Sequence, residues 1–595
     1  MLKRSVFIIF EILEKKSKKK LFYMFFLMIV LGILEVIGVA AIGPFIALLL
    51  DRDMYQNEKF FVYLNSIISA KNYEDFFIIY AFITFLLILF INFFNVVFQI
   101  LINRFSNFQA HKSSVNLFRN YLKKPYNFFL NTHPDILSKN ILTEVHRGVA
   151  GIILPLLNIC SKFLILLFMI IFLSFVNFLV IFLSIFILFI FYLTVYGFLK
   201  NKLTILGRNN NSAMFSRFKF VNEALKNIKF LKLSGKEYKF IEYFSLPSKV
   251  DAKTRTLNII YSILPRYVVE VISFFLLILF SVILIVSNNS NINSFFPLMG
   301  IFGMAIFRMI PCMQGIYSSL TSLRYNMPAF DLIREDLKKH SNKKINDIEI
   351  LQPFKSIEIK NISYSYAKMK KLFFIESIKI KSKNIIGLCG KSGSGKTTSL
   401  DLISGMLNPI SGSLIYNEKD ITNKNTNYSK LLSYIPQNSF LFQATIAENI
   451  SFLDLDEIIN NKEISKKIEK ACASSELTDL ININKDGIFT KIGGGERNLS
   501  NGQIQRIGIA RAIFQDREII ILDESTSSLD PVTEEKIINN VNNLNKTIII
   551  VSHNIALLKK CNYIYFFEDG IIKKEGYPAD IKEIFSEINT SDNKK

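Results

Sequence analysis

Residues 385–398 read IIGLCGKSGSGKTT, and this stretch decides the fold of the C-terminal half of the chain. An apolar run with β character leads into a glycine-rich loop that ends in Gly-Lys-Thr, the spacing of a phosphate-binding loop. In such a loop the backbone N–H groups cradle phosphates, the lysine reaches the β/γ-phosphates and the hydroxyl binds Mg²⁺. We therefore predict an α/β nucleotide-binding domain. The residues expected around the phosphates are Gly390, Ser392, Gly393, Ser394, Gly395, Lys396, Thr397 and Thr398.

Two later apolar runs supply groups that the phosphate loop lacks. The run EIIILDE at 518–524 ends in Asp523, placed to hold Mg²⁺ through water, and Glu524, placed to polarise an attacking water. The run TIIIVSH at 547–553 ends in His553, which could donate to a γ-phosphate from the same edge of a parallel sheet. A structural histidine is the alternative for His553. The three side chains predict a hydrolytic centre at the carboxyl ends of neighbouring strands.

Two further residues are weaker candidates. Gln437, in YIPQNSFLF, follows a predicted strand and could contact Mg²⁺ and the lytic water. Tyr366, in ISYSYAK, lies upstream of the phosphate loop and could stack on adenine. A glutamine in a loop is usually solvated and a tyrosine in a strand usually belongs to the core, so their order along the chain is what supports the prediction.

The N-terminal half has the composition of a membrane domain. Half of the 595 residues are hydrophobic, the mean hydropathy is +0.31, and the long apolar runs lie before about residue 336. The formal net charge is +22, and much of the excess lies in EKKSKKK and in segments 104–147 and 199–266. By the positive-inside rule this pattern predicts cytoplasmic termini and argues against a nucleic-acid partner. The predicted spans are 21–48, 76–102, 152–174, 177–199, 267–287 and 295–320.

The segments between and beside these spans carry further predictions. The long basic segments after spans 2 and 4 have helical apolar spacing, so we expect them to extend the membrane helices into the cytosol. Residues 60–68, FFVYLNSII, predict a short amphipathic helix, either on the outer leaflet or packed as a loop helix. The five cysteines show no CxxC spacing, so neither a zinc site nor a disulfide framework is predicted.

Charged residues inside the spans are candidates for a cargo site. Even insertion-based scales give a mid-membrane arginine a cost of about 2.5–3.5 kcal/mol. Glu35 lies in the first span and Arg308 in the last, whereas Arg266 and Glu270 lie one helical turn apart at the entry to the fifth. An intrahelical salt bridge is an equally good explanation of the Arg266–Glu270 pair.

Taken in order, these motifs resemble those of an ATP-binding cassette exporter of the half-transporter type. To the residues above they add LSNGQ at 499–503 and SSLD at 527–530, and the resemblance covers essentially the whole chain. The family usually has Gly where Asn501 stands, and asparagine tolerates left-handed backbone conformations better than most residues. The resemblance implies an α-helical polytopic membrane domain with six transmembrane helices and cytoplasmic extensions. An α/β P-loop ATPase domain with a helical subdomain follows it.

The resemblance also implies partners and cofactors. It implies ATP with Mg²⁺, two active ATP sites, and a homodimer in which the LSNGQ motif of one subunit closes over the phosphate loop of the other. The residues that it implies for that contact are Ser500, Gly502 and Gln503, with Asp530 coupling the two sites and Arg497 contacting the cytoplasmic helices. The expected divisions are a membrane domain at 1–335, a linker at 336–352, a cassette at 353–583 and a disordered tail at 584–595.

Within exporters, the stretch 260–335 and the helix after span 1 are most similar to the bacterial flippase of lipid-linked oligosaccharides in protein N-glycosylation. That resemblance implies a bacterial inner-membrane protein whose cargo has a polyprenyl tail, a pyrophosphate and a glycan, and Arg308 could bind the pyrophosphate bidentately. A second basic residue is expected about two turns beyond Arg308, where Gln314 and Gly315 stand. Two alternatives remain: an exporter of another amphipathic cargo, such as a lipid, peptide or drug, and a membrane-bound regulatory ATPase.

Overall fold

The computed structural model describes residues 13–175, 178–287, 292–337, 352–366, 373–422, 426–493 and 499–579. The chain divides into two compact units. One is Met1–Lys124 with Phe128–Asn342, and the other is Pro125–Asn127 with Lys343–Lys595. The predicted tail at 584–595 and nearly all of the predicted linker at 336–352 lie outside the described residues.

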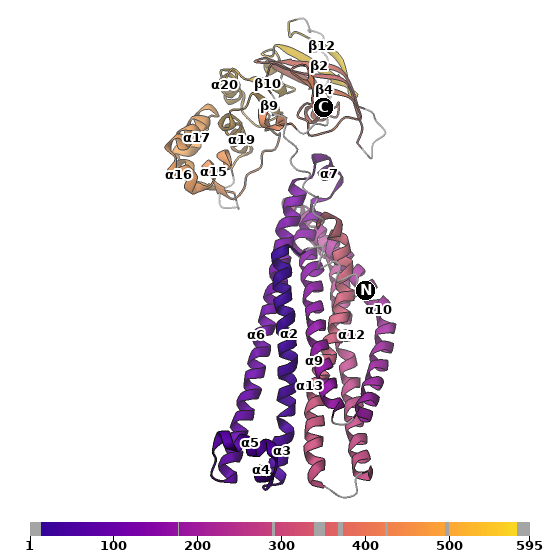
Figure 1. Cartoon of the computed structure of the whole chain (residues 1–595). Coiled ribbons are helices and arrows are strands. Elements are labelled where there is room, and N and C mark those ends of the chain that lie inside the picture. Colours follow the sequence, from indigo (N-terminus) through magenta and orange to yellow (C-terminus); the bar gives the residue numbers. More distant parts are fainter. Residues whose placement is uncertain are drawn as a thin grey trace. The chain divides into compact units, whose positions relative to one another are not determined.

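The first unit is built from helices, drawn in indigo to rose in Figure 1. The long helices are α2 (Lys15–Ala40), α6 (Tyr73–Leu122), α9 (Gly151–Ser174), α10 (Phe178–Lys226), α12 (Glu237–Ser287) and α13 (Ile292–Leu337). Shorter elements connect them: α3 (Ile42–Leu50), α4 (Met54–Asn57), α5 (Lys59–Ile68), α7 (Tyr126–Asn131, whose first two residues are counted in the second unit), α8 (Pro134–Lys139), the π-helical turns η1 (Asn140–Glu144) and η2 (His146–Ala150), and α11 (Ile228–Ser234). Helices α9 and α13 pack together, as do α2 with α9 and α10 with α12.

Five helical segments of the described chain are long and apolar enough to cross a membrane. They are Lys15–Leu50, Tyr73–Leu122, Pro134–Ser174, Glu237–Phe275 and Met299–Leu337, and each overlaps one predicted span. The remaining predicted span, 177–199, falls on α10 except for residue 177, which is outside the described residues. Helices α6, α10, α12 and α13 are each 46–51 residues long, well beyond the roughly 20 needed to span a bilayer. The predicted helical continuation of the spans is therefore confirmed.

The predicted short helix after the first span is α5. Phe61 is buried against Phe76 and Tyr80 of α6, which lie in the same apolar cluster as Leu48. The other side of α5 leaves apolar side chains exposed, among them Phe60, Tyr63 and Ile67. One face therefore packs as a loop helix would, and the opposite face is apolar enough to meet lipid.

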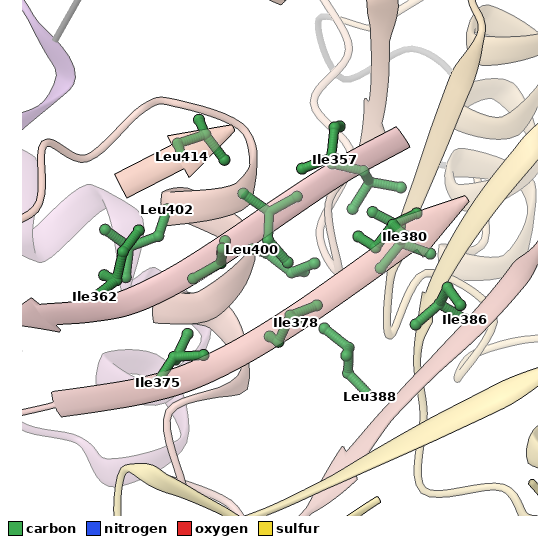
Figure 2. Close-up of a cluster of buried hydrophobic side chains, with 14 of the residues drawn as sticks. Ile357, Ile362, Ile375, Ile378, Ile380, Ile386, Leu388, Leu400, Leu402 and Leu414 are labelled. Atoms are coloured by element: carbon green, nitrogen blue, oxygen red, sulfur yellow. The ribbon is translucent and has the colours of Figure 1, made fainter. Parts of the chain in front are cut away.

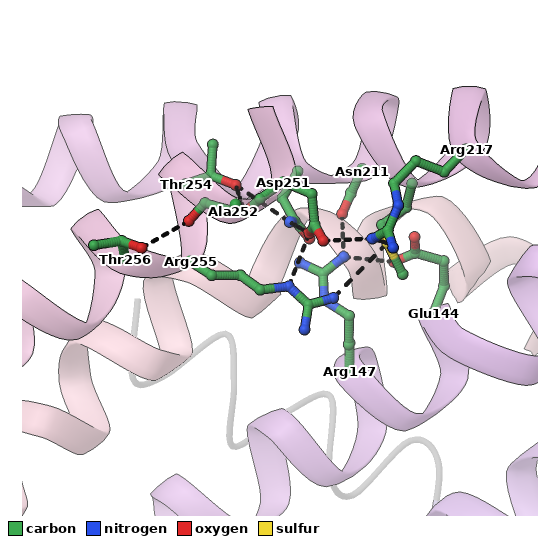
Figure 3. A network of polar contacts seen from close by, with 11 residues as sticks. Glu144, Arg147, Asn211, Arg217, Asp251, Ala252, Thr254, Arg255 and Thr256 are labelled. Carbon is green, nitrogen blue, oxygen red and sulfur yellow. Dashed lines mark hydrogen bonds and ion pairs between the residues drawn. The ribbon is translucent and has the colours of Figure 1, made fainter. Parts of the chain in front are cut away.

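A charged network joins α10 and α12 outside the apolar stretches (Figure 3). The Asp251 carboxylate accepts from Arg255 Nε at 2.8 Å, from Arg217 Nη1 and from the side-chain amide of Asn210. The fully buried Glu144 carboxylate lies beside it and pairs with Arg147 at 3.2 Å. Arg147 also donates to Asn211 of α10, 64 residues further along the chain, at 2.7 Å, so the network includes the segment before α9 as well.

The second unit contains two main sheets. A six-stranded sheet has the order β12-β11-β3-β10-β9-β6, parallel except for β12, and a four-stranded antiparallel sheet has the order β2-β1-β4-β5. The strands of the first are β3 (Ile385–Gly390), β6 (Leu432–Ile435), β9 (Ile519–Asp523), β10 (Thr547–Val551), β11 (Tyr563–Glu568) and β12 (Ile571–Gly576). Those of the second are β1 (Ser356–Tyr364), β2 (Phe373–Lys381), β4 (Ser411–Tyr416) and β5 (Lys419–Asp420). The central strands β9 and β10 are buried along their full length, as their unbroken apolar runs predict.

The core of this unit lies where the two sheets and α14 (Lys396–Ile403) meet (Figure 2). Ile357 and Ile378 of the antiparallel sheet pack in one cluster with Leu388 of β3 and Leu400 of α14. A separate helical cluster forms a subdomain in which α19 (Asn501–Gln515) packs against α15 (Ile446–Ser451) and α17 (Lys462–Ser474). The other elements of the unit are α16 (Leu455–Asn460), α18 (Thr478–Asn482), α20 (Pro531–Asn542), α21 (Ile555–Leu558), β7 (Ala444–Thr445), β8 (Lys491–Ile492) and the 3₁₀ turns η3 (Tyr428–Leu431) and η4 (Gly487–Phe489).

Candidate functional site

The phosphate loop connects β3 to α14, as the sequence predicts. Its backbone needs glycine at two places: Gly395 has φ +105°, and a Cβ on Gly390 would lie 2.1 Å from the Phe567 carbonyl oxygen. The Lys396 ammonium donates to the carbonyls of Gly390 at 2.6 Å and Lys391 at 3.1 Å. Burial lowers the pKa of Lys396, and the neighbouring Glu524 opposes that shift. The lysine therefore lies folded back on its own loop, with its charge beside the carboxylates of the next strands.

Four of the predicted residues meet at the carboxyl edge of the parallel sheet. Lys396 Nζ lies 3.1 Å from His553 Nε2, and that nitrogen lies 3.3 Å from Glu524 Oε1. On its other side, Glu524 Oε2 accepts from the Gln437 amide at 2.9 Å. These groups come from the phosphate loop and from the ends of β10, β9 and β6. Their meeting follows from the strand order, since those strands are neighbours in one sheet.

The backbone at Glu524 is unusual for a residue with a side chain. Its φ is +47°, in the left-handed region, which costs a non-glycine residue roughly 1–3 kcal/mol unless the surroundings hold it there. Its N–H donates to the Val551 carbonyl at 3.1 Å, and Gln437 and His553 hold the carboxylate. A hollow of about 270 Å³ adjoins Glu524 and His553, so the held carboxylate borders space for a reacting molecule.

Asp523 is buried at the end of β9. Its Oδ2 accepts from the Tyr434 hydroxyl at 2.8 Å, and burial raises the pKa of Asp523. Burial also raises the pKa of Asp401, on α14, to about 6, with the charge of Asp523 adding to the effect. Two partly desolvated carboxyl groups beside the phosphate loop are the electrostatic setting that a divalent cation would relieve.

The residues present fit a nucleotide with its metal ion. The Ser394 hydroxyl in the loop is buried without a hydrogen-bond partner, and the exposed Thr397 lies in the first turn of α14, where backbone N–H groups are unpaired. Phosphate oxygens would satisfy both. No group of three His, Cys, Asp or Glu residues able to hold a metal occurs in the described part of the chain. Mg²⁺ is compatible with that, because it is usually held by one or two protein ligands, water and the phosphates.

Tyr366 lies two residues after the end of β1, and its hydroxyl is 3.1 Å from the Thr398 hydroxyl of α14. Its ring meets Tyr364 edge-on, with centroids 5.1 Å apart. The structure thus places Tyr366 beside the helix that follows the phosphate loop. Stacking on adenine remains a prediction.

The LSNGQ motif forms the start of α19. Ser500 is the N-cap: its hydroxyl accepts from Gln503 N at 3.2 Å while Gln503 Oε1 accepts from Ser500 N at 2.9 Å, a complete capping box. Asn501 is the first residue of this right-handed helix, and a left-handed conformation is not required of it. Asparagine fits at position 501 because this position is helical and exposed to solvent. A Cβ on Gly502 would lie 3.2 Å from the Ser528 carbonyl oxygen, so this glycine allows close approach of the SSLD segment.

Gln505 is a residue that the sequence reasoning missed. It is buried two residues after the motif, donates to the Gln437 carbonyl at 3.2 Å and accepts from Ser528 N at 3.2 Å. It therefore ties α19 to both the Gln437 loop and the SSLD segment. Its only signal was a polar residue on the buried side of a helix. Asp530, in SSLD, caps α20 by accepting from Thr533 N at 2.9 Å, and these hydrogen bonds lower the pKa of Asp530. Arg497 lies outside the described residues.

In the first unit the structure brings two of the predicted charged residues together. Arg308 Nη1 of α13 lies 3.5 Å from Glu35 Oε2 of α2, and the Asn95 amide of α6 donates to the other Glu35 oxygen. Glu35 is 5% exposed, so three helices converge on one buried carboxylate. Arg308 thus has a partner within the protein, and the pair by itself is neutral.

The Arg266–Glu270 pair has a simpler explanation. Arg266 Nε lies 2.8 Å from Glu270 Oε1 within α12, and the arginine side chain is 55% exposed. This is the intrahelical salt bridge that the sequence offered as an alternative.

Lys162 is a second residue that was missed. It lies in the middle of the predicted span 152–174, and a charge in that run was a visible signal. A Cβ on Gly315 would lie 3.4 Å from Lys162 Cγ, so the lysine packs where a basic residue was expected on α13.

A shallow hollow of about 550 Å³, open to the surface and lined by residues of α6, runs along that helix beside this region. Four side-chain amides spaced one turn apart line it: Asn95, Gln99, Asn103 and Asn107. Val96, Ile100 and Arg104 complete the lining. Because Asn95 also bonds Glu35, the hollow adjoins the buried charge pair.

The first comparison with known proteins concerns the second unit. Residues 376–527 match the family model described as ABC transporter. These residues form an ABC transporter domain. The match includes the phosphate loop, Gln437, the LSNGQ motif and Glu524, whose geometry is described above.

Curated relatives align with less than half of this chain. A lactococcin-G-processing and transport ATP-binding protein of Lactococcus lactis is 34% identical over 262 residues, which is 41% of this chain and 36% of that protein. A putative export ATP-binding/permease protein of Rickettsia typhi is 32% identical over 275 residues, 45% of this chain and 47% of that protein. The aligned regions thus cover less than half the length of these relatives.

A solved structure matches along nearly the whole chain. A bacterial Atm1-family ABC exporter with ATP bound superposes with a TM-score of 0.79 at 17% identity, covering 97% of this chain and 99% of that one. The chain therefore has the exporter fold: a helical polytopic membrane domain followed by an ATPase domain.

Proposed function

We propose that this protein is an ATP-driven exporter in which each cassette hydrolyses ATP at Glu524. The supporting geometry is the chain of contacts from Gln437 through Glu524 and His553 to Lys396, which places a held carboxylate next to the phosphate loop. Glu524 would act as the base that orients water, His553 and Lys396 would stabilise charge on the γ-phosphate, and Asp523 with Thr397 and Gln437 would hold Mg²⁺. The working unit is a homodimer in a bacterial inner membrane with cytoplasmic termini.

The proposed cargo is a polyprenyl-pyrophosphate oligosaccharide, moved from the cytoplasmic to the outer leaflet. The observation that carries this proposal is the buried Glu35–Arg308 pair beside the amide-lined hollow on α6. A guanidinium suits a pyrophosphate, and a row of amides can both donate to and accept from sugar hydroxyls. The exposed apolar face of α5 suits the polyprenyl tail. Arg266 is the weaker candidate for this site, because Glu270 of the same helix pairs with it and its side chain is 55% exposed.

The test is translocation of a polyprenyl-pyrophosphate oligosaccharide by the purified full-length protein in proteoliposomes. We expect ATP-dependent flipping by the wild type and a loss of about tenfold or more in Arg308→Ala, because a charged hydrogen bond to the cargo is removed. Arg119→Ala, an exposed arginine on the same long helix as the hollow, is the matched control and should transport normally. ATP hydrolysis without any glycan transport by the wild type would contradict the cargo while leaving the motor intact.

A second candidate is export of another amphipathic molecule, such as a lipid, peptide or drug. The observation that favours it is the neutrality of the Glu35–Arg308 pair, which offers no net charge to an anionic cargo. Transport of uncharged amphiphiles by both the wild type and Arg308→Ala would support this candidate.

A further inference from the structure

Lys162 places a charge inside the membrane-crossing part of α9. It lies roughly 18 Å of helix rise before Ser174, where α9 ends. A hydrocarbon layer is about 30 Å thick, so an α9 that crosses it carries the ammonium within the layer. Among the described residues, no ion pair or side-chain hydrogen bond of Lys162 occurs. Such residues usually face a cavity or a substrate pathway.

The stem of Lys162 lies against the helix that carries Arg308. A Cβ on Gly315 would be 3.4 Å from Lys162 Cγ and 3.9 Å from both Cδ and Cε, so the side chain runs lengthwise across this glycine. Arg308, Cys312 and Gly315 are spaced at i, i+4 and i+7, which places them on one face of α13. Lys162 therefore extends along the face of α13 that bears Arg308.

The local charges do not cancel once Lys162 is included. Lys162 packs against Gly315, two helical turns beyond Arg308 on the same face of α13, and Glu35 pairs with Arg308. Glu35 neutralises Arg308, and Lys162 leaves the group with an excess of one positive charge. With this positive charge included, the neutrality of the Glu35–Arg308 pair is no longer a reason to favour an uncharged cargo.

We infer that Lys162 is the second cation of the Arg308 site and that the two side chains together bind the pyrophosphate of a lipid-linked cargo. Arg308 and Gly315 are separated by roughly 10 Å of helix rise, a separation that two linked phosphates bridge better than one. The guanidinium supplies a bidentate fork and the ammonium a compact point charge. This inference rests on the proposed function, because it assigns the anion-binding residues of that same cargo.

The test is lipid binding by the full-length protein in nanodiscs of zwitterionic lipid. The probes are polyprenyl pyrophosphate, polyprenyl monophosphate and inorganic pyrophosphate. We expect the wild type to prefer polyprenyl pyrophosphate, Lys162→Met to weaken its binding about tenfold or more, and Lys162→Arg to retain it. Lys249→Met, an exposed lysine of α12, is the control and should bind as the wild type does. Equal binding by wild type and Lys162→Met would overturn the inference, as would inorganic pyrophosphate binding as tightly as the lipid.

A second variant moves the positive charge of Lys162 from α9 to α13. It distinguishes the effect of that charge on binding from the effect of the Lys162 side chain on helix packing. Gly315→Lys in the Lys162→Met background places an ammonium at the same point from α13, and the space there admits a side chain. We expect this double variant to recover pyrophosphate-lipid binding to within about threefold of the wild type. A loss that Gly315→Lys does not restore would mean that Lys162 acts through helix packing, and the inference would be wrong.

Binding and transport distinguish this inference from the proposed function. Lys162-dependent binding of polyprenyl pyrophosphate without glycan transport would uphold the anion site and reject the glycan flippase. Glycan transport by the wild type, together with normal binding and transport by Lys162→Met, would uphold the glycan flippase and reject Lys162 as part of the anion site.

Discussion

At the scale of single residues, Glu524 is the proposed base for ATP hydrolysis. Its left-handed backbone and its contacts with Gln437 and His553 fix the carboxylate at the edge of the sheet. We expect Glu524→Gln to lower ATP turnover by roughly 100-fold or more while nucleotide binding is retained, because the amide cannot act as a base. Phosphate release and nucleotide binding by the purified protein measure the two effects. Glu535→Gln, an exposed residue of α20, is the control, and substantial turnover by Glu524→Gln would rule out the assigned base.

Asp401 gives a prediction about pH. Its pKa is raised to about 6 from an ordinary 3.8, so between these values the folded state binds more protons than the unfolded state. The free energy of unfolding therefore falls as pH rises from about 4 to 6, and the cost persists above that range. Asp401→Asn should raise the free energy of unfolding of the cassette by about 1–2 kcal/mol at pH 7 and show little gain near pH 4. Calorimetry at both pH values, with the exposed Asp456→Asn as control, measures this; a pH-independent gain would contradict the explanation.

Residues were predicted from the sequence where a motif or an unusual position marks them. Lys396, Glu524 and His553 follow apolar runs whose order along the chain is diagnostic, and Arg308 and Glu35 stand out as charges in apolar spans. Their partnerships could not be predicted, because the Glu35–Arg308 contact depends on how α2 and α13 pack. Lys162 had the same signal as Arg308, but its contact with Gly315 could not be predicted, because it depends on how α9 and α13 pack.

At the scale of elements, the junction of α10 and α12 depends on Asp251. Its 6% exposed carboxylate binds Asn210 and Arg217 of α10 and Arg255 of its own helix. Asp251→Asn leaves two guanidinium groups without their anion, although solvent reaches both. We expect a loss of about 1–3 kcal/mol and a fall of several degrees in the unfolding temperature of the membrane unit.

Thermal unfolding of the full-length protein in detergent measures this loss. The matched control is Glu242→Gln, an exposed acidic residue on the same helix. Equal unfolding temperatures for the two variants would show that the network contributes little and that apolar packing alone joins α10 to α12.

Elements also differ in how far the sequence predicts them. The strands β9 and β10 were predicted because a buried parallel strand is an unbroken apolar run. Helices α6 and α10 were predicted to continue past their spans because helical apolar spacing continues in the basic segments. The antiparallel sheet was not predicted: β1 and β2 alternate buried and exposed residues over short stretches, and their pairing with β4 is set by the fold around them.

At the scale of the whole molecule, each chain contributes one phosphate loop and one LSNGQ motif. In the described structure the Ser500 hydroxyl caps its own helix and is exposed, so it remains available to a second chain. If each ATP site combines the phosphate loop of one subunit with the motif of another, two differently inactivated chains can complement each other. Lys396→Ala disables the first half of a site and Ser500→Arg the second.

Each variant alone should lack ATPase activity, since both of its sites contain a defect. In a dimer of one chain of each kind, one site carries both substitutions and the other carries neither. Random mixing makes half of the dimers mixed, and each mixed dimer has one intact site of two. We therefore expect the ATPase activity of the unsorted protein to recover toward roughly a quarter of the wild-type value. Co-expression with two affinity tags, followed by ATPase measurement on the doubly purified and the unsorted protein, tests this. Doubly tagged dimers that remain as inactive as either parent would mean that each chain builds its own site, and the homodimeric mechanism would have to be abandoned.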